Sequence, residues 1–294
     1  MSAGARVASF GALLVALFAL AVLAGRTLDP ATEAAVPAGH GAPGGSGADA
    51  HDAAAAHGGG ADAHATAPAA GAAAASGLRL VAQPPTTFSA GRPGRLTFRV
   101  VDARGQTLRD FETEQARRMH VIVVRRDLRR FQHLHPTQAA DGAWSTPLTL
   151  PDAGVYHAFA DFRTGGERTT LGVDLFAGGE FEPLALPPAT PTARVDGYDV
   201  RLEQRHGARD PAELRFAVSR GGTPVTDLQP HLGARGHLVM LRAGDLAYAH
   251  VHPLTTDALA FATEELTPGR YRLFLQFRHE DKVHTAAFTR TVTP

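Results

Sequence analysis

The feature that most constrains the fold is an internal duplication. Residues 96–100 (LTFRV) match residues 214–218 (LRFAV), and residues 120–125 (HVIVVR) match residues 237–242 (HLVMLR). The offset is 117 residues from the first histidines onward and falls to 115 by Tyr156 and Tyr271. A segment that recurs in this way is one folding unit used twice. The sequence therefore predicts two copies of one module, at residues 78–177 and 195–294.

Each module consists of short β-type runs. Pro, Gly and Asp separate them, and no segment keeps a 3.6-residue apolar period, so the predicted fold class is all-β. About 100 residues of short strands is the size of an immunoglobulin-like sandwich, and Tyr156 and Tyr271, each after a Gly-containing turn, resemble its tyrosine corner. We expect two tandem immunoglobulin-like β-sandwich modules, with a cupredoxin-like sandwich as the alternative. Residues 178–194, with four prolines, predict a semi-rigid linker.

The first 77 residues add nothing to a core. Residues 7–25 are 19 uncharged residues, long enough for a helix that crosses a bilayer. We expect a signal-anchor transmembrane helix at 1–26, with a cleaved secretory signal as the alternative. Residues 31–77 contain 21 Ala and 10 Gly, so 27–77 is predicted to be a disordered tether. Its four histidines are either a weak metal-collecting tail or low-complexity drift.

Composition excludes several classes of function. The chain has no cysteine, which rules out disulfides, iron–sulfur clusters, thiol catalysis and a Cys-ligated copper centre. Its 29 basic residues balance 29 acidic ones, so it has no electrostatic footprint for nucleic acid. A β-rich domain without cysteine behind an apolar helix is typical of a protein located outside the cytoplasm. We expect a single-pass protein of the cell membrane with its modules outside, or a secreted protein if the signal is cleaved.

Histidines recur with one spacing in both modules: His, twelve residues, His, one residue, His, Pro. The six candidate metal ligands are His120, His133, His135, His237, His250 and His252. Residues two apart on a strand face the same side, so each His-x-His pair points both imidazoles one way. Three neutral imidazoles suit Zn²⁺ or Cu²⁺. The other interpretation is that these histidines are structural and only support hairpins.

The expected hairpin register places the first histidine of each module on the same strand face as the His-x-His pair. Gly244-Asp245 lies midway between His237 and His252 and is a two-residue hairpin signal. A hairpin closed there places His237 opposite His252, with His250 on the same face. The same arithmetic, with positions that sum to 255, places His120 opposite His135. A slip of one residue would send the first histidine to the other face.

These motifs resemble a family of actinobacterial membrane-anchored or secreted proteins. The resemblance rests on residues 119–128 with 133–136 (HLHP) and on residues 236–246 with 250–253 (HVHP), and it covers residues 78–294. It implies two modules behind a His-rich tether and an association with heavy metals or copper. Family members carry His-Glu where this chain has Gln115-Ala116, which implies a weaker first site if those positions supply ligands.

The sequence thus predicts an extracytoplasmic, membrane-anchored metal-binding protein that buffers or handles Cu²⁺ or Zn²⁺ at a His₃ site in each module. Its partners would be the metal ion and the membrane. The alternative is a metal-free envelope scaffold that binds another envelope protein. A His₃ metal-dependent enzyme ranks third, because the chain has no catalytic motif and no carboxylate at matching positions near both triads.

Overall fold

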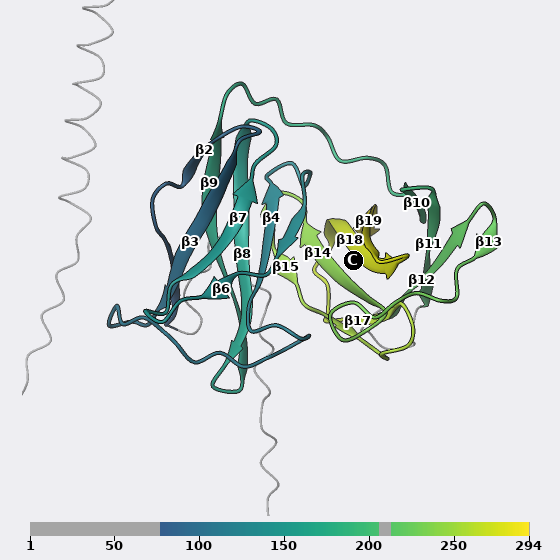
Figure 1. Ribbon diagram of the computed structural model, residues 1–294. Coiled ribbons are helices and arrows are strands. Elements are labelled where there is room, and N and C mark those ends of the chain that lie inside the picture. Colours follow the sequence, from purple (N-terminus) through teal and green to yellow (C-terminus); the bar gives the residue numbers. More distant parts are fainter. Residues whose placement is uncertain (1–76, 206–212, 294) are drawn as a thin grey trace, which may run out of the picture. The chain divides into compact units, whose positions relative to one another are not determined.

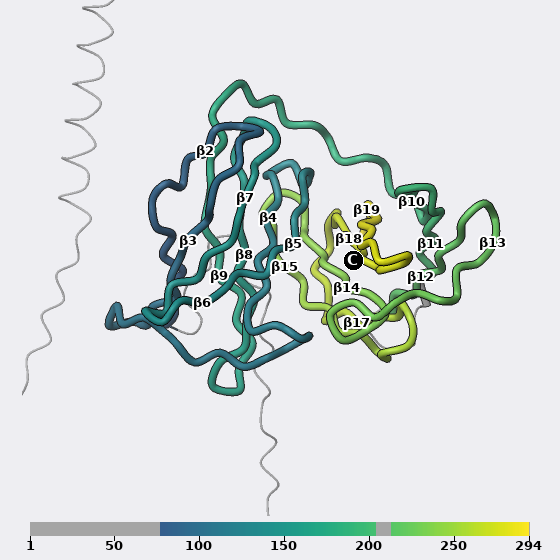
Figure 2. The backbone as a smooth tube through the Cα atoms, viewed as in Figure 1, coloured from purple at the N-terminus to yellow at the C-terminus, as the bar shows by residue number. Residues whose placement is uncertain are grey.

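The computed structural model describes residues 77–205 and 213–293, which contain strands, turns and loops and no α-helix. The predicted anchor at 1–26 and the tether up to residue 76 lie outside the described residues. Within the part of the chain that is described, no helix is long and apolar enough to cross a membrane. Both modules belong to the same compact unit. The strands are labelled in Figure 1, and Figure 2 shows the backbone course.

Module 1 consists of two sheets. One has the strand order β1-β3-β7-β6 and the other β2-β9-β8-β4-β5. The strands are β1 (Arg79–Ala82), β2 (Thr87–Ser89), β3 (Pro93–Val101), β4 (His120–Arg125), β5 (Gln132–Leu134), β6 (Thr137–Gln138), β7 (Trp144–Thr149), β8 (Gly154–Thr164) and β9 (Glu167–Gly178). Their inner faces share one hydrophobic core around Trp144, Tyr156 and Phe98. The predicted all-β class is confirmed for this module.

Module 2 repeats the plan. One sheet has the order β10-β11-β12-β17-β16, with β13 beside β12, and the other has the order β15-β14-β18-β19. The strands are β10 (Thr192–Val195), β11 (Tyr198–Arg205), β12 (Glu213–Arg220), β13 (Thr223–Pro224), β14 (Gly236–Arg242), β15 (Tyr248–Ala249), β16 (Val251–Pro253), β17 (Ala260–Thr263), β18 (Gly269–His279) and β19 (Lys282–Val292). A second core, around Tyr198, Phe261 and Phe288, fills the space between them. The chain is therefore a tandem of two β-sandwich modules.

The two modules pack on each other through a third hydrophobic core. Strands β4 and β14 are buried along almost their whole length. Only one face of each strand packs inside its own sandwich, so the other face would be expected to contact solvent. Val121 and Val123 point into the core of module 1, whereas Ile122 and Val124 join Val239 and neighbouring residues of module 2. Alternate residues on a strand face opposite sides, so an unbroken apolar run is buried on both faces. This double burial explains why the HVIVVR and HLVMLR segments lack polar alternation.

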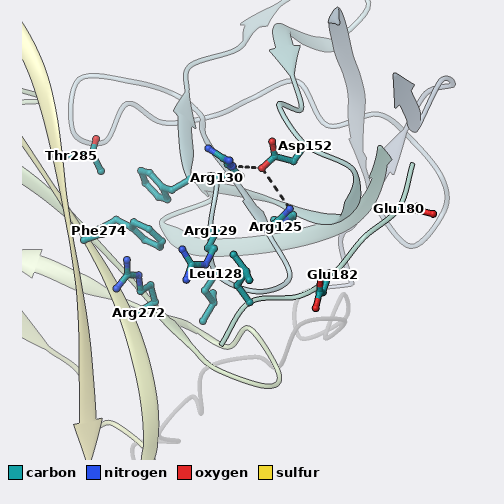
Figure 3. Close-up of a pocket in the computed structure, with 13 residues that line it drawn as sticks. Arg125, Leu128, Arg129, Arg130, Asp152, Glu180, Glu182, Arg272, Phe274 and Thr285 are labelled. Atoms are coloured by element: carbon teal, nitrogen blue, oxygen red, sulfur yellow. Dashed lines mark hydrogen bonds and ion pairs between the residues drawn. The ribbon is translucent and has the colours of Figure 1, made fainter. Parts of the chain in front are cut away.

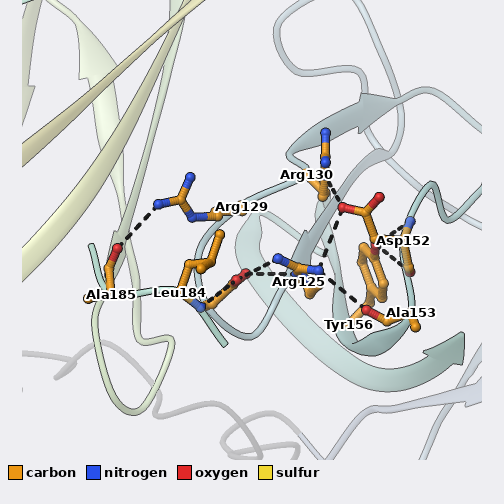
Figure 4. A network of polar contacts seen from close by, with 9 residues as sticks. Arg125, Arg129, Arg130, Asp152, Ala153, Tyr156, Leu184 and Ala185 are labelled. Carbon is orange, nitrogen blue, oxygen red and sulfur yellow. Dashed lines mark hydrogen bonds and ion pairs between the residues drawn. The ribbon is translucent and has the colours of Figure 1, made fainter. Parts of the chain in front are cut away.

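The tyrosine corners are present in both modules. The hydroxyl of Tyr156 donates to the carbonyl oxygen of Asp152 at 2.9 Å, and the hydroxyl of Tyr271 donates to that of Thr267 at 2.8 Å. In each module the bond returns from the start of a long strand to the backbone four residues upstream, as the sequence predicted. Figure 4 shows the first of these corners.

The linker between the modules contacts both of them. In module 1, Asp127 accepts a hydrogen bond from the Leu184 N–H at 3.3 Å, and Arg129 donates to the carbonyl oxygen of Ala185 at 3.2 Å (Figure 4). In module 2, Arg270 donates to the carbonyl oxygens of Leu186 and Pro187. The linker thus follows the junction of the modules and is bound on both sides.

We expect Leu241→Ala to lower the free energy of unfolding by about 2–5 kcal/mol, because the side chain is fully buried in the core between the modules. If the modules did not pack together, this side chain would face solvent and the change would cost less than about 0.5 kcal/mol. Urea unfolding measures the difference. Leu184→Ala, at a linker residue that is 51% exposed, is the matched control and should leave stability nearly unchanged.

Candidate metal centre

His120, His133 and His135 form a cluster at the junction of the modules. Strand β4 starts at His120, and the pairs Val121↔Leu134 and Ile122↔His133 set the register of β4 against β5. These positions sum to 255, so the predicted register is confirmed. One ligand atom from each of the three imidazoles lies within 4.8 Å of the others. Among residues 77–205 and 213–293, it is the one group with this geometry.

The hydrogen bonds of the first two rings point outward. Nε2 of His120 donates to the carbonyl oxygen of Glu114 at 3.2 Å, and Nδ1 of His133 donates to Oε1 of Gln276 at 2.7 Å. The remaining nitrogens, Nδ1 of His120 and Nε2 of His133, lie 3.0 Å apart. A neutral imidazole has one N–H, so if both outer bonds are made, the two inner nitrogens face each other with lone pairs. A proton on one ring, a change of tautomer or a metal ion between the two nitrogens would relieve their repulsion.

Burial disfavours protonation of these imidazoles. It lowers the pKa of His133 well below the usual value, and the charge of His120 lowers it further. Burial also lowers the pKa of His120. For His135, burial and His120 lower the pKa to about 4, and its Nε2 is buried without a hydrogen-bond partner among the described residues. These imidazoles are neutral at pH 7, which is the form that ligates metals.

Module 2 contributes residues to the same cluster. The ring of His237 stacks on that of His120, with centroids 5.7 Å apart, and lies 4.6 Å from that of His133. Its Nε2 is buried and has no hydrogen-bond partner in the described part of the chain. Burial lowers its pKa strongly, and His133 and His120 add to the shift. Gln276 of β18 orients His133, and His231 is close enough to lower the pKa of His133.

The predicted second triad does not form. The pairs Met240↔Ala249 and Leu241↔Tyr248 sum to 489, so the predicted register is confirmed next to the turn. Pairing with β14 then stops, and the chain crosses to the other sheet, where His252 pairs with Ala262 of β17. The prediction that His237 faces His252 is therefore wrong. The physical reason is that the strand changes sheets at His250 and does not continue as one hairpin arm.

An arginine lies where the second site would be. Nη1 of Arg168 is 3.3 Å from Nδ1 of His252, and the same guanidinium forms ion pairs with Asp161 and Glu114, both at 3.5 Å. By the repeat offsets, Asp161 corresponds to Gln276 and Glu114 to His231. A fixed cation held by two carboxylates thus lies beside His252, where a metal ion was expected.

Sequence reasoning missed three contributors to the cluster: Gln276, His237 as a member of the first set, and His231 as its neighbour. The available signal was the apolar run after each first histidine. His120 and Ile122 share a strand face, as do His237 and Val239, and both apolar residues lie in the core between the modules. The Gln115-Ala116 dipeptide forms a turn in which both residues have positive φ, next to the Glu114 carbonyl that orients His120.

Residues 73–178 and 193–294 match the protein family described as Domain of unknown function (DUF8832). The chain belongs to this family. The two matched segments correspond to the two β-sandwich modules, so a DUF8832 domain is present here as two repeated segments. A comparison with curated proteins gave no match.

Three solved structures are remotely similar to this DUF8832 protein. Alpha-2-macroglobulin of Salmonella is 13% identical, with a TM-score of 0.27, and that of E. coli is 11% identical, with a TM-score of 0.27. The matches cover 74% and 76% of this chain, which spans 14% of each macroglobulin. A protein of Corynebacterium diphtheriae, described as membrane anchored, is 10% identical, with a TM-score of 0.23, over 74% of this chain and 59% of its own. No functional inference follows from these likenesses.

We expect the metal-free protein to lose stability as the pH falls below about 6.5, the ordinary histidine pKa. The folded-state pKa values of His133 and His237 are lowered, so in this range the unfolded chain binds more protons than the folded one. Each imidazole that stays neutral in the folded state adds to this loss as the pH falls through the ordinary histidine pKa. Urea unfolding in the presence of a chelator, compared between wild type and His133→Asn, measures this. An equal pH dependence in both would contradict the prediction.

Proposed function

We propose that this protein is an extracytoplasmic metal-binding protein that holds one Cu²⁺ or Zn²⁺ ion at His120, His133 and His135 and thereby buffers or handles the metal. The observation that carries the proposal is the 3.0 Å approach of two inner imidazole nitrogens whose partner nitrogens donate outward. A ligating histidine typically donates its other N–H to a carbonyl or a carboxylate, which fixes its tautomer and orientation. Glu114 and Gln276 provide such acceptors.

His237 is our candidate for a fourth ligand. Its ring lies against those of His120 and His133, and its buried Nε2 has no hydrogen-bond partner among the described residues. Structural zinc sites are almost always closed and four-coordinate. Catalytic zinc sites typically have three protein ligands and one open position. A four-histidine set would thus favour metal storage or transfer over hydrolysis.

The cellular setting is part of the same proposal. The uncharged segment at 7–25 would anchor the chain, and the modules would lie outside the cytoplasm. Because the modules have no cysteine, imidazole is their main available metal ligand. We also propose that the modules are immunoglobulin-like, which the two tyrosine corners support.

We expect full-length, untagged protein in mild detergent to bind Cu²⁺ or Zn²⁺ saturably, and His133→Ala with His135→Ala to abolish this site. Isothermal titration calorimetry measures the binding. Because the tether carries four histidines, the reference protein has His40, His51, His57 and His64 replaced by Ser. No saturable binding to this reference, or the same binding after the double substitution, would refute the metal site and favour the metal-free scaffold.

The orientation of His133 gives a second, finer prediction. Replacing Gln276 with Leu removes the acceptor for Nδ1 of His133 without touching a ligand, and should weaken metal binding about 10–100-fold. Gln138→Leu is the matched control, because this amide hydrogen-bonds Arg118 and the backbone of Arg109 and none of the clustered histidines. Equal affinities for the two variants would show that Gln276 does not orient a ligand.

A further inference from the structure

A cavity of about 660 Å³ opens at the junction of the modules, and none of the clustered histidines lines it. Figure 3 shows Arg129 of module 1 beside Arg272 of module 2, with Leu128 and Phe274 around them. Phe131 also lines the cavity, and its ring stacks on that of Phe274 with centroids 4.2 Å apart. The site therefore combines two guanidinium groups with an apolar aromatic wall.

Among the described residues, no carboxylate pairs with either of the two arginines. Arg129 donates to the carbonyl oxygen of Ala185, and Arg272 donates to the hydroxyl of Thr289 at 3.0 Å, so their known partners are neutral. The Nε atom of each is buried without a hydrogen-bond partner among the described residues. Burial lowers the pKa of Arg272, and the charge of Arg129 lowers it further. Two like charges that lie close together in a partly buried site destabilise each other, and an anion between them relieves this.

The pseudo-equivalent position in module 1 shows what is missing. By the repeat offset of 115, Arg272 corresponds to His157 and Thr289 to Asp174. In module 1, Nδ1 of His157 lies 2.6 Å from the carboxylate of Asp174, which also pairs with Arg126 at 2.9 Å. The same register that carries an acid in module 1 carries a hydroxyl in module 2. Module 2 therefore has an arginine where module 1 has a histidine, and the partner of this arginine is a hydroxyl where module 1 has a carboxylate.

The other charged residues that line the cavity do not neutralise Arg129 or Arg272. Arg130 pairs with Asp152, and the Arg125 guanidinium is held by Asp127 and Asp152, as the dashed lines in Figures 3 and 4 show in part. Glu180 and Glu182 line the cavity from the linker and are exposed. No ion pair joins either of them to Arg129 or Arg272 among the described residues.

We propose that this cavity binds a small organic carboxylate, with the carboxylate between Arg129 and Arg272 and its apolar body against Phe131 and Phe274. A guanidinium is a planar fork of donors that matches a carboxylate, and charge-assisted bonds of this kind are the strong ones. The cavity volume falls within the range of small-molecule sites, which pair an apolar lining with a few polar groups. The ligand would contact both modules at once.

Benzoate is a suitable probe, because it has a carboxylate and an aromatic body. We expect full-length protein in mild detergent, at about 0.15 M salt, to bind it saturably in calorimetry. Arg272→Gln and Arg129→Gln should each weaken binding about 10–100-fold, since each removes a charged hydrogen-bond partner. Arg126→Gln is the matched control, because its arginine is paired with Asp174, and it should bind like wild type.

Three results would overturn the proposal: no saturable binding of benzoate, the same affinity in Arg272→Gln as in wild type, or inorganic phosphate binding as tightly as benzoate. The last result would show that charge alone governs the site. Circular dichroism melting of each variant checks that it is folded. Arg129→Gln, in a turn outside the strands, gives an independent reading if Arg272→Gln unfolds. None of these readouts depends on a bound metal.

Discussion

Burial of both faces of β4 and β14 is the constraint on which the rest of the structure depends. A strand of a two-sheet sandwich ordinarily buries one face and exposes the other. Here Ile122 and Val124 meet Val239 and Leu241 on what would be the outer faces of two sheets. Removing these side chains from water stabilises the contact between the modules, because apolar burial contributes roughly 25 cal/mol per Å². The two modules therefore share a hydrophobic core, which two independent domains joined by a flexible linker would not have.

The position of the histidines follows from that packing. Strand alternation places His120 on the same face as Ile122 and His237 on the same face as Val239, so both imidazoles project into the junction of the modules. His133 pairs with Ile122 on the adjacent strand and reaches Gln276 of the other module. The cluster is thus built from two modules, so a metal ion held there, as we propose, would also strengthen the contact between them. Burial at the junction also keeps the imidazoles neutral and ready to ligate.

The two copies have diverged at equivalent positions, and the divergence is chiefly one of charge. Where the first cluster has Gln276 and His231, the other side of the junction has Asp161 and Glu114, and these acids hold Arg168 beside His252. Where module 1 has Asp174, module 2 has Thr289, and Arg272 is left without an acid. One duplicated scaffold thus carries a histidine cluster on one side of the junction, an arginine neutralised by two acids on the other, and a cavity lined by arginines.

The sequence by itself determined the local features, because strands, turns and cross-strand register depend on residues that are close along the chain. It predicted the all-β class, the duplication, the tyrosine corners and the register that brings His120, His133 and His135 together. Only the tertiary structure decided where the second set of histidines goes. The strand after Ala249 changes sheets, and the outer faces of β4 and β14 meet. Both events depend on which apolar surfaces can be buried against each other across more than 100 residues of chain, and no local spacing encodes that choice.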